Sequence, residues 1–206
     1  MIKAVLFDFD GVLTIDKTGS ATITNYISDT CGIPLENVKS CYYKFNKQLL
    51  LGETTHQEIW KDFCQSLGQD IDYSILLDSF KLTRLDDKMI ELVKELKERY
   101  LIGMVTDNKC DRISTILEYR GLNPYFDVVA ISACIHSGKA TRDIFDYVLN
   151  TLNVSANECV FIDNTEKNLV VPKQMGMSTI FYNDDNRDFD LFVRDLGKRG
   201  LNVKYQ

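Results

Sequence analysis

The strongest constraint on the fold of this chain is a set of five short, almost uninterrupted apolar segments. These segments, rich in Val, Ile, Leu and Phe, are Ala4 to Phe9, Leu101 to Thr106, Asp127 to Ser132, Cys159 to Ile162 and Ser178 to Tyr182. Because their apolar residues are continuous and do not alternate with polar ones, each is expected to be a strand buried on both faces. Helical patterns separate the later segments, at Asp86 to Arg99, Lys109 to Arg120 and Thr141 to Leu152. This alternation predicts an α/β domain with a parallel sheet.

Residues 15–82 interrupt the alternation. They read as helices, one of which begins at the capping-box sequence Thr55-His56-Gln57-Glu58. Ligands of open α/β sheets bind outside the carboxyl ends of the strands, so a helical insert after the first strand is expected to close over that edge. We therefore predict an α-helical cap domain at 15–82 and an α/β core domain formed by 1–14 and 83–206.

Composition excludes several classes of protein. With 206 residues, the chain has room for one main domain with an appendage. A net charge of -6 opposes a nucleic-acid or anionic-membrane partner, because such surfaces need excess Lys and Arg. No segment approaches the ~20 apolar residues of a membrane helix, and the first strand follows without a leader, so we expect a cytoplasmic protein. The six scattered cysteines are expected to be reduced thiols without a zinc cluster or disulfide framework, and nothing indicates an oligomeric state.

Polar side chains follow the predicted strands where those strands end. Asp8 and Asp10 close the first strand, and side-chain alternation along a strand is expected to put their carboxylates on one side. Two carboxylates at such a short distance repel each other and need a compensating cation. Oxygen ligands of this kind suit Mg²⁺. The later strands lead into Thr106, Asp107 and Asn108, then Lys139, then Asp163 and Asn164. Together these residues predict a metal, a nucleophile and phosphate-binding groups at one edge.

These motifs make the chain similar to the haloacid dehalogenase (HAD) superfamily of phosphohydrolases. The first motif, D-x-D-G-V-x-T, runs from Asp8 to Thr14, and the second is a Thr that closes an apolar strand, Thr106. The third is Lys139 ahead of a helix, and the fourth is Asp163 in Val-Phe-Ile-Asp-Asn. One motif alone would be unspecific, but four in order, spanning essentially the whole chain, form a specific signal.

The resemblance implies a Rossmann-like, three-layer core with a parallel sheet, an α-helical cap, and a role for each matched residue. Asp8 would attack phosphorus and become an aspartyl-phosphate, and Asp10 would act as general acid and base. Thr106, Asn108 and Lys139 would bind the substrate. Mg²⁺ would be held by Asp8, the backbone carbonyl of Asp10, Asp163 and Asn164. The implied function is magnesium-dependent hydrolysis of a small phosphorylated metabolite, and chain length and cap resemble those of sugar-phosphate phosphatases.

Three positions depart from the family pattern. Asn164 stands where many relatives have a second acid, so metal affinity is expected to be weaker. Ala140 replaces the proline that commonly follows the third-motif lysine, which leaves the loop of Lys139 less rigid. Pro172 falls inside the helix predicted from Glu166 to Met175 and should kink or shorten it.

Other functions stay open at this point. A phosphosugar mutase of the β-phosphoglucomutase type would need a G-V-x-R-x-S segment that the cap lacks, and dehalogenases lack the acid at Asp10. A receiver-type signalling domain would have no helical insert. A catalytically idle member that binds a phosphorylated ligand is compatible with Asn164. Within the cap, Trp60 is expected in the core rather than in a substrate wall, and Glu53 is expected to be a solvated loop acid.

Overall fold

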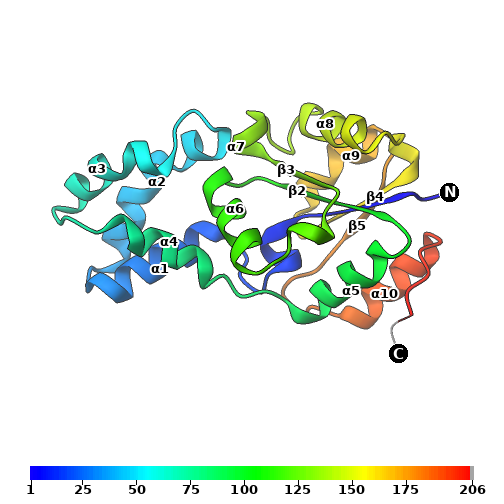
Figure 1. Cartoon of the computed structure of the whole chain (residues 1–206), viewed down its shortest axis with the longest axis horizontal. Helices are drawn as coiled ribbons and strands as arrows, with labels where there is room; N and C mark the ends of the chain where they lie inside the picture. The colour runs from blue at the N-terminus through cyan, green and yellow to red at the C-terminus, as the bar shows by residue number, and fades with distance from the viewer. Residues whose placement is uncertain (205–206) are drawn as a thin grey trace.

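A computed structural model, which describes residues 1–204, contains a five-stranded sheet in the order β3-β2-β1-β4-β5 (Figure 1). The strands are β1 (Ala4–Phe7), β2 (Leu101–Thr106), β3 (Val128–Ile131), β4 (Cys159–Asp163) and β5 (Ser178–Phe181). Every neighbouring pair is parallel, which confirms the predicted sheet. The central strand is β1, so the ends of β2 and β4 flank the residues that follow it.

Helices cover both faces of the sheet. On one face, Val5 and Phe7 pack in one apolar cluster with residues of α5 (Asp87–Lys97), α6 (Cys110–Tyr119) and α10 (Phe189–Lys198). On the other face, Ala4 and Leu6 pack with α8 (Asp143–Leu152) and, at its margin, α9 (Val170–Gln174). This three-layer arrangement confirms the predicted Rossmann-like α/β core. The shorter elements are α7 (Ser132–Ile135), η2 (Asn123–Tyr125), η3 (Ala156–Glu158) and η4 (Glu166–Leu169).

The insert between β1 and α5 is helical. It contains α1 (Gly19–Cys31), α2 (Leu35–Leu51), α3 (His56–Leu67) and α4 (Tyr73–Lys81), which lie together at one end of the molecule (Figure 1). The capping box of Thr55 and Glu58 is present. Trp60 is buried and its Nε1 donates to the Ile71 carbonyl at 2.8 Å, so its predicted place in the core is confirmed. Glu53 is exposed. The domain boundaries at residues 15 and 82 stay a prediction.

The end of β1 differs from the prediction. The strand stops at Phe7, and the turn η1 (Phe9–Leu13) follows, with Gly11 at φ 80°. A Cβ on Gly11 would lie 2.2 Å from Asn164 Nδ2, so this turn needs glycine for both its conformation and its space. Because residues 9–13 leave the strand, side-chain alternation does not relate Asp8 to Asp10. The expectation that a strand pairs these two carboxylates was therefore wrong.

Two further local features bear on the predictions. The helix expected over 166–175 is divided into η4 and α9, with Pro172 in the first turn of α9, where a missing N–H removes no helical hydrogen bond. Cys110 and Cys134 form a disulfide, so the expectation of six reduced thiols was wrong for this pair. Neighbouring strands β2 and β3 bring the two residues together, with their Cα atoms 5.7 Å apart. Within residues 1–204, each helix is too short or too polar to cross a membrane.

Candidate active site

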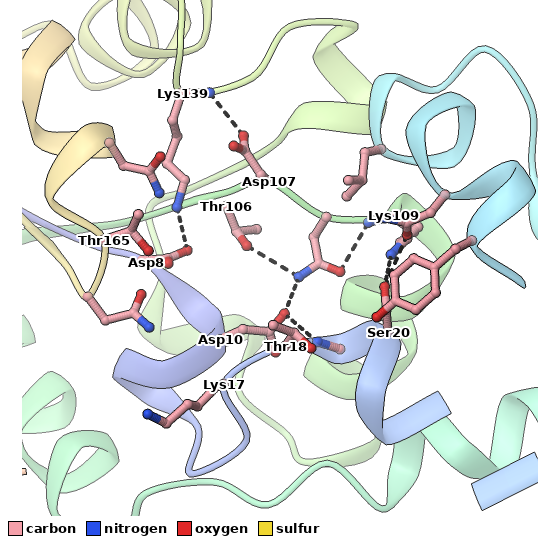
Figure 2. A pocket seen from close by; sticks show the side chains of 17 residues that line it. Asp8, Asp10, Lys17, Thr18, Ser20, Thr106, Asp107, Lys109, Lys139 and Thr165 are labelled. Carbon is pink, nitrogen blue, oxygen red and sulfur yellow. Dashed lines mark hydrogen bonds and ion pairs between the residues drawn. The ribbon is translucent and has the colours of Figure 1, made fainter. Parts of the chain in front are cut away.

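A buried lysine, Lys139, contacts two carboxylates at the carboxyl edge of the sheet, and Figure 2 shows its contact with one of them, Asp8. Lys139 Nζ lies 2.8 Å from Asp8 Oδ1 and 2.6 Å from Asp163 Oδ2. The Ala140 departure therefore does not keep Lys139 from reaching the end of β1. Asp163 ends β4 and is fully buried, whereas Asp8 is 6% exposed and faces the cavity.

The charges of this group influence one another strongly. Burial raises the pKa of Asp8 to about 7, with the Lys139 ammonium acting against the rise and Asp163 adding to it. Burial alone would lower the pKa of Lys139, but the carboxylates of Asp8, Asp163 and Asp107 together raise it. Lys139 is therefore a fixed cation beside the Asp8 carboxylate, whose charged form is costly to bury. The position next to the Lys139 ammonium suits an anionic phosphoryl group.

Neighbouring groups hold this cluster in place. Asp107 Oδ1 accepts the Lys139 N–H at 2.9 Å, and a Cβ on Gly138 would lie only 2.9 Å from the same oxygen. Asp163 Oδ1 accepts the Thr165 N–H at 2.7 Å and the Asn168 amide at 3.1 Å. The anchoring contact of Asp107 was not predicted, although its position directly after Thr106 at a strand end was visible in the sequence.

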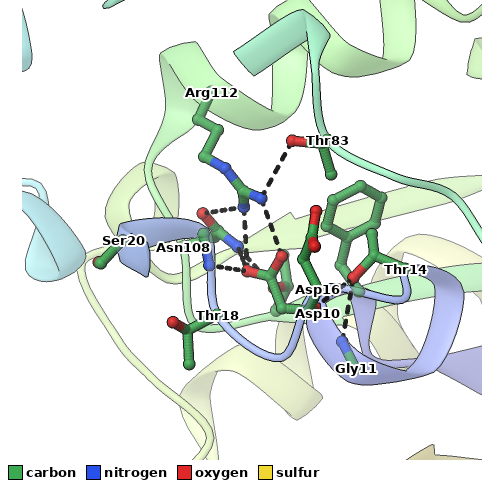
Figure 3. A network of polar contacts seen from close by, with 12 residues as sticks. Asp10, Gly11, Thr14, Asp16, Thr18, Ser20, Thr83, Asn108 and Arg112 are labelled. Atoms are coloured by element: carbon green, nitrogen blue, oxygen red, sulfur yellow. Dashed lines mark hydrogen bonds and ion pairs between the residues drawn. The ribbon is translucent and has the colours of Figure 1, made fainter. Parts of the chain in front are cut away.

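Asp10 lies in a separate network of polar contacts (Figure 3). Arg112 binds it with both terminal nitrogens: Nη2 lies 2.9 Å from Asp10 Oδ1 and Nη1 lies 2.9 Å from Oδ2. Oδ2 also accepts from Asn108 Nδ2 at 2.8 Å and from the Gly19 N–H at 3.2 Å. Arg112 is fully buried. Sequence reasoning missed it, although it stands four residues before the buried Ile116 and hence on the inner face of α6.

Thr106 and Asn108 belong to the network of Asp10. Thr106 ends β2, is buried, and its Oγ1 accepts from Asn108 Nδ2 at 3.3 Å. The Asn108 N–H donates to Ser132 Oγ at 2.9 Å, which fixes the loop after β2 against the segment after β3. Both side chains line the same cavity as Asp8 and Lys139.

The cavity lies between the sheet edge and the helical insert and has a volume of about 250 Å³. The core contributes most of the predicted site residues to its wall, namely Asp8, Asp10, Thr106, Asn108, Lys139 and Asn164. The insert contributes Thr18, Gly19, Ser20, Tyr43, Asn46 and Leu50. Asp163 is not in the wall, but its Oδ2 contacts Nζ of Lys139, which is. This volume is below the usual range for ligand pockets, which favours a small ligand.

The donor atoms near Asp8 suit a hard divalent cation. Asp8 and Asp163 supply carboxylate oxygens, and Asp10 supplies a backbone carbonyl. Asn164 lines the cavity and its Nδ2 donates to Asp184 Oδ2 at 3.0 Å, which orients the amide. Residues 1–204 contain no group of three or more His, Cys, Asp and Glu side chains arranged for a metal. The oxygens available here are of the type that Mg²⁺ prefers, but acidic side chains alone would not complete its ligand set, and carbonyl or amide oxygens would have to contribute.

Comparisons with known proteins bear on the family and the fold of the chain. The sequence model of the haloacid dehalogenase-like hydrolases matches residues 2–176. A phosphatase of Mycobacterium tuberculosis is 25% identical over 210 residues, covering 97% of this chain and 95% of the relative. Bifunctional epoxide hydrolase 2 of Sus scrofa is 24% identical over 221 residues, which is 96% of this chain but 38% of that protein. The fold is similar to that of a HAD family enzyme from Bacteroides thetaiotaomicron, crystallised with magnesium and inorganic phosphate, with TM-score 0.74, 20% identity and coverage of 93% and 100% of the two chains.

Proposed function

Because the chain belongs to the haloacid dehalogenase-like hydrolase family, we propose that it hydrolyses small phosphomonoesters through phosphorylation of Asp8, with Mg²⁺ as its cofactor. The observation that carries the proposal is the contact between Asp8 and Lys139 at the end of the central strand, at the wall of a small cavity. A carboxylate is a suitable nucleophile, and a covalent intermediate divides one difficult displacement into two easier ones.

In the first step, an Asp8 oxygen attacks phosphorus and the ester P–O bond breaks. Asp10 gives a proton to the leaving oxygen, while Lys139 and the Thr106 hydroxyl bind the phosphoryl oxygens. In the second step, Asp10 takes a proton from water, the water oxygen attacks phosphorus, and the bond between phosphorus and Asp8 breaks. The products are an alcohol and phosphate, and both aspartates return to their starting states.

Three donors fix the position of the Asp10 carboxyl group. Its Oδ2 accepts from Gly19, Asn108 and Arg112. They hold the carboxyl group at the wall of the cavity, which is the position from which it would exchange a proton with the substrate.

Mg²⁺ would be held by Asp8, the Asp10 carbonyl, Asp163 and Asn164. When bound, it would screen the repulsion between the Asp8 carboxylate and an anionic ester. These ligand assignments remain part of the proposal.

The insert supports a sugar phosphate as the substrate class. Thr18, Ser20 and Asn46 line the cavity with hydroxyl and amide groups, which suit a polyhydroxylated leaving group. The small volume of the cavity favours a leaving group of a few carbons.

The test is phosphate release from sugar phosphates, nucleotides and an aryl phosphate, each measured with Mg²⁺ and with EDTA. We expect turnover that EDTA abolishes and that Asp8→Asn reduces below detection, because an amide is not a nucleophile for this reaction. Asp62→Asn, which changes an exposed aspartate on α3, is the matched control and should keep full activity. Absence of turnover by a folded protein that binds Mg²⁺ would favour phospholigand binding, and isomerised esters without phosphate release would favour a mutase.

A further inference from the structure

A second buried lysine, Lys109, belongs to the core and lines the same cavity on the side that faces the insert. It stands at the N-cap of α6, is 4% exposed, and its Nζ donates to Ser20 Oγ at 2.9 Å. The same Nζ lies 5.6 Å from the centre of the Tyr42 ring. Ser20 Oγ in turn donates to Asn46 Oδ1 at 3.0 Å, which fixes the hydroxyl with an oxygen lone pair toward Lys109.

Lys109 differs from Lys139 in having no carboxylate partner. Within residues 1–204, no ion pair involves Lys109, whereas Lys139 pairs with Asp8 and Asp163. The two nearby carboxylates are bound elsewhere: Asp10 by Arg112, and Asp111 by His56 Nδ1 at 2.7 Å. Burying an ammonium without an anion is unfavourable. Accordingly, burial and the Arg112 cation lower the pKa of Lys109 to about 7.

Lys139 and Lys109 lie on opposite sides of Asp10 (Figure 2). Lys139 contacts the nucleophile, so the transferred phosphoryl group belongs at its end of the cavity. Lys109 contacts Ser20 of α1, so it faces the part of the cavity that the leaving group would occupy. An anion at that place would complete the pairing that the protein itself does not provide.

We propose that Lys109 binds a second oxyanion, a carboxylate or a second phosphate, on the leaving group of the substrate. The inference rests on the proposed phosphatase function and narrows it: the substrate class is an acidic phosphomonoester, such as a phosphorylated sugar acid or a bisphosphate. Lys109 is then a specificity-determining residue that discriminates such esters from neutral alcohol and sugar phosphates.

The test compares matched esters that differ at one group. One pair is 3-phosphoglycerate and glycerol 3-phosphate, which differ by a carboxylate; the other is the bisphosphate and the monophosphate of propane-1,3-diol. We expect the wild-type protein to prefer the acidic member of one pair by about tenfold to a hundredfold in kcat/KM, the usual range for a hydrogen bond to a charged group. The preferred pair identifies the source of the oxyanion.

Lys109→Met should reduce that preference to about unity and leave the neutral member within about threefold of its wild-type kcat/KM, since only the charged contact is lost. Lys17→Met is the matched control, because Lys17 lines the same cavity but is already paired with Asp184 and Asp185. The preference of Lys17→Met for the acidic ester should stay at the wild-type value.

The inference is overturned if the wild-type protein hydrolyses both members of each pair equally, a measurement that does not depend on the folding of any variant. A preference that survives in Lys109→Met would also overturn it. In either case the proposed phosphatase function stands. If no ester is hydrolysed at all, that function fails and this inference fails with it.

Discussion

At the residue scale, the most unexpected contact is between Asp10 and Arg112. A guanidinium presents two parallel N–H donors to a carboxylate and so fixes both its position and its orientation. Here the pair is buried, with Arg112 fully inaccessible and Asp10 only partly exposed. Removing one partner of such a pair leaves an uncompensated buried charge. Arg112 is therefore expected to fix the position of Asp10, the proposed general acid and base.

Arg112→Gln tests this role. We expect kcat to fall by about tenfold to a hundredfold, a part of the ~10² to 10⁴ that general acid-base help usually contributes, because Asp10 stays in place but loses its orientation. The change in KM should be much smaller because Arg112 does not line the cavity. Arg112→Lys keeps the charge without the two parallel donors and should recover part of kcat. Arg142→Gln, on the exposed start of α8, is the control. Equal changes in KM and kcat, or no recovery by lysine, would indicate a purely structural role.

At the element scale, both connections of the helical insert pass close to Arg112. Helix α1 begins at Gly19, whose N–H donates to Asp10, and Thr83 Oγ1 lies 3.4 Å from Arg112 Nη2. The two connections also pair with each other through Thr14 and Leu85. The geometry of Asp10 therefore depends on how α1 enters the insert.

Gly19→Ala changes this junction at a single atom. The added Cβ would lie 2.2 Å from Arg112 Cζ, so the guanidinium or α1 must move and the contact with Asp10 should weaken. We expect a loss of kcat similar to that of Arg112→Gln, about tenfold or more. A double variant should lose little more than either single one, because both act on one contact. Gly197→Ala, in α10 with open space around it, should keep full activity. Additive losses in kinetic assays would contradict the shared contact.

Element by element, the sequence predicted the parts of the fold that depend on local pattern. Strand β2 was predicted at its observed bounds, because an apolar run buried on both faces needs no knowledge of its neighbours. The turn after Phe7 was missed because it is stabilised by its fit around Asn164. Arg112 was missed because its partner, Asp10, is 102 residues away in sequence. Lys109 looked like an ordinary helix start, and only the fold shows that it is buried without an anion.

At the scale of the whole molecule, the distribution of charge is uneven. The chain carries a net charge of -6, yet Lys109 and Lys139 are buried at its cavity. The overall field repels small anions, so attraction of an anionic substrate has to come from these local cations. A buried lysine without an anion also affects the stability of the whole fold, because it binds its proton less tightly in the folded state than in the unfolded one.

The free energy of unfolding, measured as a function of pH, should reveal the loss of stability that comes from burying Lys109 without an anion. The pKa of Lys109 is about 7 in the folded chain, and an unfolded lysine has a pKa of about 10.4. Between these values the unfolded state binds more protons, so this residue makes stability rise with pH from about 7 to about 10.

Lys109→Met tests this effect, because it leaves in place the other groups that face Lys109, which are Arg112, Asp10, Asp111 and Tyr42. The variant should therefore gain about 1 to 3 kcal/mol over wild type in urea unfolding at about pH 6, and this gain should shrink by about pH 9.5. Lys61→Met, at an exposed position on α3, should show no such change. A difference for Lys109→Met that is the same at both pH values would mean that Lys109 keeps its proton when buried, which requires an anionic partner within the folded chain itself.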